Sequence, residues 1–268
     1  MSDTIFNVLT IAGSDSGGGA GIQADLKTFS AFGVYGASVV TALTAQNTRG
    51  VQALHVPDAS FVSAQMDAVF DDIRIDAVKL GMLANAAIIK AVAGRLAHYA
   101  PRCVVLDTVM IAKSGHALLE ALAVRTLVEE LLPQATVITP NLPEAAALLG
   151  VPMATDEASM VEQAEALRAL GARNVLIKGG HLQSSESPDW LIGEQTSLRL
   201  GAARQPVTAT HGTGCTLSAA IAAAWPRSQD LTSAVSAAKQ YVSEAIAAAP
   251  RLSVGGGIGP LHHFHAWW

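Results

Sequence analysis

The chain has 268 residues, of which 50% are hydrophobic and only 15% are charged, and this composition excludes an intrinsically disordered protein. Seventeen Lys and Arg residues against 22 Asp and Glu residues give a formal charge of −5, which argues against a dedicated nucleic-acid or membrane-surface binder. Two cysteines cannot form a disulfide framework, and the chain shows neither a secretion signal nor an apolar run long enough to cross a bilayer. We therefore expect a soluble cytoplasmic protein.

Short apolar segments predict eight β-strands. They lie at residues 5–11, 38–45, 77–80, 103–106, 136–139, 175–177, 190–192 and 197–200. Most of them are apolar on both faces and rich in Val and Ile, which is typical of strands in a parallel sheet that is covered on both sides.

Helical patterns separate the strands. One apolar stripe follows the candidate cap Asp58, and another begins at Asp230 and stops at Pro250. This alternation predicts an open α/β sheet with helices on both faces. Because we find no internal repeat, charge block or Pro/Ser-rich linker, we expect residues 1–268 to form one domain.

Polar and glycine-rich residues follow most of the predicted strands. In open α/β sheets, ligands bind beyond the carboxyl ends of the strands. A glycine-rich turn after one strand is often only structural, but so many on one rim predict a ligand site. The residues concerned are the run 13–21, Gln46, Gly81, Met82, Asp107, Asn141, Glu144, Lys178 and His181.

Asp25 lies on the apolar face of the first predicted helix, between Phe29 and Phe32. A buried carboxylate is costly unless a donor reaches it. The donor is either the set of backbone amides in the glycine-rich loop or a group on a ligand. Gln46, at the end of a predicted strand, is also a candidate for ligand binding, since its side-chain amide can offer one donor and one acceptor to a planar heterocycle.

A second glycine-rich segment, residues 210–220, leads directly into an Ala-rich helix. Gly212, Thr213 and Gly214 would let free amides at the helix start face a ligand and form an anion site. The plainer alternative is a glycine-rich helix start without a ligand. Cys215 lies in the first turn, where the pKa of a thiol is typically lowered, so it could be a base, a nucleophile or an inert small residue.

Three common motifs are absent from the sequence. There is no P-loop motif, no dinucleotide-binding G-x-G-x-x-G and no G-x-S-x-G nucleophile elbow. These absences argue against P-loop enzymes, dinucleotide oxidoreductases and α/β-hydrolases.

Several motifs together resemble the hydroxymethylpyrimidine/phosphomethylpyrimidine kinases of thiamine biosynthesis. They are the segments 13–25, 42–48, 79–82, 139–145, 178–181 and 210–218, and the similarity extends over almost the whole chain. The resemblance implies a ribokinase-like three-layer sandwich, with a mostly parallel central sheet and helices on both faces, in a homodimer. It also implies phosphorylation of the hydroxymethyl group of an aminopyrimidine and then of the resulting monophosphate, with ATP and Mg²⁺.

The resemblance also implies roles for individual residues. Gln46 would recognise the aminopyrimidine, assisted by Gly13, Asp25, Met82 and Val109. On the nucleotide side it implies Lys178, His211, Asn141, Glu144 and Asp107, with Glu144 and Asp107 holding Mg²⁺ through water. The amides of Gly212 to Cys215 would form an anion hole, with Cys215 nearest the substrate hydroxyl, where most ribokinase-like enzymes have an Asp as base.

Two residues depart from the family pattern. Thr108 stands where a proline usually follows the aspartate, and because Asp107 remains, we expect a local backbone change rather than lost chemistry. Ala209 replaces an asparagine before the second glycine-rich run, which leaves some adenine- or phosphate-side contacts in question.

Two other functions stay open. A pyridoxal or pyridoxine kinase of the same fold would act on a similar flat ring that bears a hydroxymethyl group. A non-catalytic pyrimidine-binding regulator would keep the pocket, but the survival of Asp107, Asn141, Glu144 and Cys215 argues against it.

Overall fold

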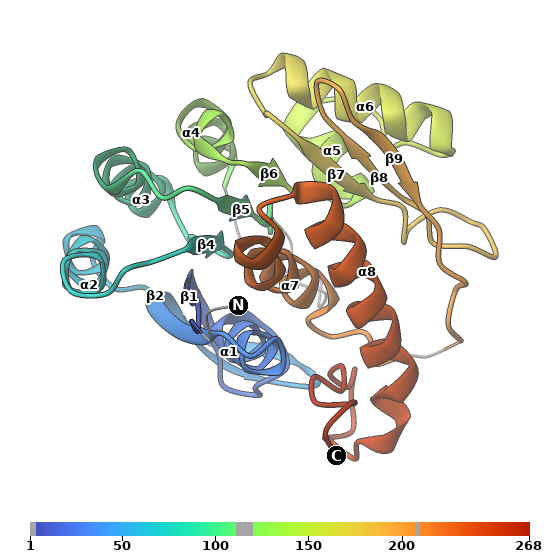
Figure 1. Cartoon of the computed structure of the whole chain (residues 1–268), viewed down its shortest axis with the longest axis horizontal. Coiled ribbons are helices and arrows are strands. Elements are labelled where there is room, and N and C mark those ends of the chain that lie inside the picture. The colour runs from blue at the N-terminus through green and yellow to red at the C-terminus, as the bar shows by residue number, and fades with distance from the viewer. Residues whose placement is uncertain (1–3, 111–119, 207–208) are drawn as a thin grey trace.

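A nine-stranded sheet forms the centre of the computed structural model, which describes residues 4–110, 120–206 and 209–268 (Figure 1). The strand order is β3-β2-β1-β4-β5-β6-β7-β8-β9. From β2 to β7 the neighbouring strands run parallel, whereas β3 at one edge and β8 and β9 at the other are antiparallel to their neighbours. The strands are β1 (Asn7–Asp15), β2 (Tyr35–Asn47), β3 (Gly50–His55), β4 (Ala77–Leu80), β5 (Val104–Leu106), β6 (Val137–Ile138), β7 (Val175–Lys178), β8 (Asp189–Ile192) and β9 (Ser197–Leu200).

Helices cover both faces of the sheet (Figure 1). They are α1 (Gly21–Ala31), α2 (Ala59–Phe70), α3 (Ala86–Tyr99), α4 (Ala121–Glu130), α5 (Leu142–Leu149), α6 (Glu157–Ala169), α7 (Thr213–Ser228) and α8 (Leu231–Ala248), with 3₁₀ turns at Leu132–Gln134 and Ala249–Arg251. One core packs α2 to α6 against the sheet, and the other packs α1, α7 and α8. Alternate strand residues face the two cores, as Val8 and Leu9 of β1 do. The three-layer fold expected from the sequence is therefore confirmed.

All eight predicted strands are present, with small shifts at their ends. The first lies at Asn7–Asp15 and so reaches the glycine-rich loop directly. Asp58 and Asp230 occupy the N-cap positions of α2 and α8, and the Asp230 carboxylate accepts a hydrogen bond from the Ser233 amide at 2.8 Å. The cap positions read from the sequence are confirmed.

The sequence prediction lacked β3. This strand lies at the sheet edge, pairs with β2 through a tight hairpin, and has several exposed side chains. It therefore shows neither the apolar run nor the alternation by which the other strands were found. In the described part of the chain, no helix is both long enough and apolar enough to cross a membrane.

Candidate active site

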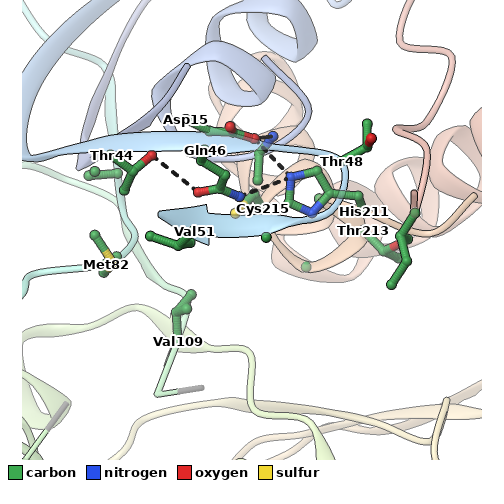
Figure 2. Close-up of a pocket in the computed structure, with 18 of the residues that line it drawn as sticks. Asp15, Thr44, Gln46, Thr48, Val51, Met82, Val109, His211, Thr213 and Cys215 are labelled. Carbon is green, nitrogen blue, oxygen red and sulfur yellow. Dashed lines mark hydrogen bonds and ion pairs between the residues drawn. The ribbon is translucent and has the colours of Figure 1, made fainter. Parts of the chain in front are cut away.

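A cavity of about 550 Å³ opens at the carboxyl ends of the parallel strands (Figure 2). It is the position at which an open α/β sheet places a ligand. Residues 16–19, Gly81 and His181, which the strand-end rule selected, do not line this cavity, whereas every residue to which the family resemblance gave a role does, with the exception of Asp25. The lining members of that set are Gly13, Gln46, Met82, Asp107, Val109, Asn141, Glu144, Lys178, His211, Gly212, Thr213, Gly214 and Cys215.

Asp15, the last residue of β1, holds the first glycine-rich loop in place. Its Oδ1 accepts a hydrogen bond from the Gly17 amide at 2.8 Å, and its Oδ2 accepts from the Gly19 and Ala20 amides at 3.1 and 2.9 Å. The Nε2 atom of His211 lies 2.8 Å from the same Oδ2. Burial alone would raise the pKa of Asp15, but His211 and the loop amides hold it below its usual value. The loop amides, one of the two kinds of donor considered for Asp25, bind Asp15 instead.

The backbone of Gln46 is held by hydrogen bonds to Ser16, and its side-chain amide has a neighbouring side chain on each side. The Oγ of Ser16 accepts a hydrogen bond from the Gln46 amide nitrogen and donates one to the Gln46 carbonyl, both at 2.8 Å. Figure 2 shows the side-chain amide between Thr44, 3.1 Å away, and His211, 3.3 Å away. The outer edge of this amide is thereby left to a ligand in the cavity.

Apolar groups line another part of the cavity, where Met82 and Val109 are grouped in Figure 2. Gly13 faces Met82 so closely that a Cβ atom at position 13 would lie 2.6 Å from the methionine Cε. An apolar surface opposite a single polar amide suits a flat heterocycle.

The start of α7 supplies the second glycine-rich wall. Gly212 is its N-cap, with φ of +82°, and a Cβ atom there would collide with the carbonyl of Gly19. Only glycine allows this backbone shape and this close approach of the two loops. The first residues of α7 line the cavity, so the positive end of the helix dipole is directed into it, where it would stabilise an anion.

Cys215 differs from the expectation for a helix start. Burial raises the pKa of its thiol to about 11, against the opposing effects of Lys79 and of a hydrogen bond from the Gly21 amide. The expected lowering of the pKa is therefore wrong, because loss of solvent outweighs the helix dipole at this position. Cys103, by contrast, is a fully buried core residue, as expected.

Asp25 does not reach the cavity. Its carboxylate is fully buried, and its Oδ2 accepts hydrogen bonds from Lys79 Nζ at 2.8 Å and from Thr10 Oγ1 at 2.6 Å. Burial raises the pKa of Asp25; for Lys79, burial acts to lower the pKa, but the charge of Asp25 raises it. Asp25 therefore lies behind Lys79, which does line the cavity, and is not itself among the lining residues.

Asp107 and Lys178 form an ion pair beside the start of α7. The Nζ of Lys178 lies 3.3 Å from Asp107 Oδ1, and Asp107 also accepts hydrogen bonds from Thr139 and Ser218. For Lys178, burial acts to lower the pKa, but the charge of Asp107 raises it, so the ammonium stays charged. A Cβ atom at Gly214 would lie 3.4 Å from Lys178 Nζ, so the ammonium borders the glycine-rich wall.

Asn141 and Glu144 form a capping box at the start of α5. Asn141 Oδ1 accepts from the Glu144 amide, and Glu144 Oε2 accepts from the Asn141 amide, both at 2.9 Å. Thr108 Oγ1 donates to the same Oε2 at 3.1 Å, a bond that proline could not make. Burial raises the pKa of Glu144, against the opposing charge of Lys178. The departure at Thr108 therefore adds a contact to the site, whereas Ala209 faces Gly259 and does not line the cavity.

Sequence reasoning gave no individual role to several residues that line the cavity, among them Asp15, Lys79 and Arg49. Asp15 opens a glycine-rich loop, a position where a carboxylate commonly accepts from backbone amides, and this signal could have been read. Lys79 is a charged residue inside a four-residue buried strand, which signals a hidden partner. Arg49 lies in the β2–β3 hairpin, which was missed together with β3.

Comparison with known proteins places the chain in a family. The family model described as phosphomethylpyrimidine kinase matches residues 15–262. The hydroxymethylpyrimidine/phosphomethylpyrimidine kinase of Escherichia coli K12 is 58% identical over 262 residues, which cover 98% of each chain. Among solved structures, a phosphomethylpyrimidine kinase from Clostridium difficile has 44% identity and a TM-score of 0.80 over 90% of this chain and 99% of the other. An ADP complex of a Bacillus subtilis pyridoxal kinase has 37% identity and a TM-score of 0.91, and the match covers 98% of this chain and 99% of the other. The chain belongs to the phosphomethylpyrimidine kinase family.

Proposed function

We propose that the protein is an ATP-dependent kinase of thiamine biosynthesis. It phosphorylates 4-amino-5-hydroxymethyl-2-methylpyrimidine on the hydroxymethyl group and then phosphorylates the monophosphate to the diphosphate. The names of the curated relatives support both activities.

One observation carries this proposal. The Gln46 amide and the glycine-rich start of α7 line the same cavity, although they are more than 160 residues apart in the sequence. The amide suits the nitrogen-bearing edge of the pyrimidine, and the helix start suits a phosphoryl group. A kinase needs both sites within one cavity.

The residues divide the transfer between them. The substrate oxygen attacks the γ-phosphorus of ATP, the bond from that phosphorus to the β–γ bridging oxygen breaks, and ADP leaves. The amides of Gly212 to Cys215 and the Lys178 ammonium stabilise the charge on the moving group. We assign Cys215 Sγ as the acceptor of the hydroxyl proton in the first step; the monophosphate is already anionic and needs no base in the second.

The acidic residues fit a magnesium ion. Mg²⁺ is usually held by one or two carboxylates, by waters and by nucleotide phosphates. Asp107 and Glu144 both line the cavity beside Lys178, and Asn141 orients Glu144. We propose that Asp107 and Glu144 hold the ion through water, where it would neutralise phosphate charge, with Lys178 on the nucleotide side. His211, expected on that side as well, instead contacts Asp15 and the Gln46 amide.

Phosphate-resolved product analysis with the hydroxymethylpyrimidine and ATP-Mg²⁺ tests the proposal. We expect successive formation of the monophosphate and the diphosphate. Gly214→Asp should impair both steps, because it adds a carboxylate next to Asp107, 3.5 Å from the new Cβ. Gly94→Asp makes the same charge change at an exposed site with open space around it and should leave both steps unchanged. A protein that binds the pyrimidine but consumes no ATP would instead be the non-catalytic regulator.

A pyridoxal kinase is the second candidate, favoured by the likeness to the Bacillus subtilis pyridoxal kinase. Competition between the pyrimidine and pyridoxal in one ATP-consumption assay separates the two. We expect the pyrimidine to be used in preference.

We also propose that the chain is a single catalytic domain that forms a homodimer in the cytoplasm. The described cysteines are free thiols, which suits a reducing compartment. β3 is an edge strand whose outer backbone groups can pair with a partner subunit, and its Leu54 is about half exposed. Sedimentation equilibrium, with Leu54→Lys as the disrupting variant, tests the dimer.

A further inference from the structure

The two flanks of the Gln46 amide have different hydrogen-bonding capacities. On one side lies Nε2 of His211, 3.3 Å from the amide, and on the other lies Oγ1 of Thr44, 3.1 Å away (Figure 2). His211 Nε2 also lies 2.8 Å from Asp15 Oδ2. Asp15, His211 and Gln46 therefore form a chain of contacts that ends at the ligand-binding amide.

The proton on His211 Nε2 follows from the surroundings of Asp15. Asp15 already accepts hydrogen bonds from three backbone amides, two of them on the oxygen that faces His211. A carboxylate in that position is an acceptor only. Nε2 must therefore carry the proton and donate it to Asp15, in the neutral ring as well as in the charged one.

Because the one proton on Nε2 is donated to Asp15, Nε2 has no lone pair with which to accept from Gln46 and can offer Gln46 only the longer arm of a shared, three-centre hydrogen bond. With the amide nitrogen on the side that faces Nε2, as drawn in Figure 2, two N–H donors would face each other. A half-turn of the carboxamide exchanges oxygen and nitrogen in the same two positions. Gln46 Oε1 then faces His211, and Gln46 Nε2 donates to Thr44 Oγ1, which donates onward to the Ser14 carbonyl at 2.8 Å.

We infer that the Asp15–His211 pair locks the Gln46 amide in this one orientation and thereby sets the donor and acceptor pattern that the site accepts. This inference rests on the proposed function, because it concerns the ring that Gln46 binds. Once both flanks are occupied, the outer edge of the amide keeps one N–H and one oxygen lone pair. A locked amide accepts one order of donor and acceptor on a ring and rejects the reverse order.

The 4-amino and 4-oxo forms of the pyrimidine are a matched pair for this property. The 4-amino ring presents an acceptor at N3 and a donor at C4, whereas the 4-oxo ring presents a donor at N3 and an acceptor at C4. Their shapes are nearly the same, and the ring cannot turn over because its 5-hydroxymethyl group has to face the start of α7. The site should therefore discriminate between them by hydrogen bonding alone.

His211 and Thr44 should contribute unequally to the lock. The Thr44 hydroxyl can rotate, so it can accept from an amide nitrogen or donate to an amide oxygen. The His211 Nε2–H, fixed by Asp15, can only donate. His211 therefore sets the direction of the amide, while Thr44 supports whichever direction has been set.

The experiment measures binding and kcat/KM for both rings in the wild-type protein, His211→Leu and Thr44→Val. We expect the wild type to prefer the 4-amino ring by at least about a hundredfold. His211→Leu should reduce the preference for the 4-amino ring to less than about tenfold. Thr44→Val should weaken the binding of both rings but keep most of that preference. Equilibrium binding without ATP keeps the ratio measurable even if His211→Leu slows the transfer.

Three results would overturn the lock: an unchanged preference in His211→Leu, a collapse in Thr44→Val alone, or a wild type that binds both rings equally. In the last case the proposed function still stands if the 4-amino ring is phosphorylated. A wild type that phosphorylates neither ring would instead refute the proposed function.

A measurement on the wild-type protein covers the case in which His211→Leu does not fold. Two-bond ¹H–¹⁵N correlation spectra of histidine-labelled protein distinguish a protonated ring nitrogen from an unprotonated one. The His211 signal is assigned by its loss in His211→Asn. We expect a protonated Nε2 at pH 8, and an unprotonated Nε2 would overturn the lock.

Discussion

The buried ion pair between Asp25 and Lys79 gives the most demanding prediction. Both side chains are inaccessible to solvent, and their charged atoms lie 2.8 Å apart. Asp25→Asn would leave the Lys79 ammonium buried without its counter-charge. Removal of one partner of such a pair typically costs about 3–5 kcal/mol of the free energy of unfolding. For a chain of this length, we expect the melting temperature to fall by roughly 6–15 °C.

The double replacement Asp25→Leu with Lys79→Met should behave differently. It removes both charges at once and leaves apolar side chains of similar size in an apolar surrounding. Replacement of a whole buried pair is often neutral, so we expect a cost below about 2 kcal/mol, well under the sum of the single replacements. The Asp25 Oδ1 atom has no hydrogen-bond partner among the described residues, so removing the carboxylate also removes the free-energy cost of burying this atom unpaired.

Urea unfolding followed by circular dichroism measures these differences, with Glu165→Gln as the control. Glu165 and Arg168 form an ion pair of similar length, 2.9 Å, but the glutamate side chain is half exposed. Loss of an exposed pair should cost less than about 1 kcal/mol. If Asp25→Asn costs no more than this control, or if the double replacement costs as much as the two single ones together, the reasoning on the buried pair is refuted.

Three further predictions concern other sites. If Cys215, with a pKa raised by burial to about 11, is the base of the first step, the rate of that step should rise about tenfold per pH unit from pH 7 to 10. The second step should lack this rise, and Cys215→Ala should abolish it; parallel profiles for both steps would exclude the base role. Thr108→Val removes a hydrogen bond to buried Glu144 and should lower the free energy of unfolding by about 1–3 kcal/mol in urea titrations, whereas no change would show that this bond contributes nothing. Burial, with nearby positive charges, lowers the pKa of His263 to about 4, so only the unfolded chain takes up this proton between about pH 6.5 and 4. The free energy of unfolding should therefore decrease as the pH is lowered from about 6.5 to 4, by up to roughly 3 kcal/mol. His263→Phe should show a smaller decrease when melting is measured across this pH range.

The layered fold could be read from the sequence because its signals are local. Ala77–Leu80 and Ser197–Leu200 were predicted with the bounds that they have in the structure, since each is a short strand-like run set off from its neighbours. The edge strand Gly50–His55 was missed because its stability comes from pairing with β2 rather than from its own pattern.

The site was predictable as a set of residues but not as a set of contacts. The strand-end rule and the family motifs select the residues that line the cavity, because the carboxyl ends of parallel strands meet at one edge. The pairing of Asp25 with Lys79 joins residues 54 positions apart, and no local spacing encodes it. The raised pKa of Cys215 likewise depends on solvent exclusion by segments distant in sequence, which a helix-start argument does not contain.

The interlocking of the first glycine-rich loop with the start of α7 has a consequence for how activity arises during folding. The bond between Asp15 and His211 spans 196 residues, so the two walls come together only after most of the chain has been synthesised and docked. A partly made or partly folded chain would possess either the ring-binding wall or the phosphoryl-binding wall, but no enclosed reaction chamber. The complete cavity therefore forms only at the end of assembly, when nearly the whole chain has folded.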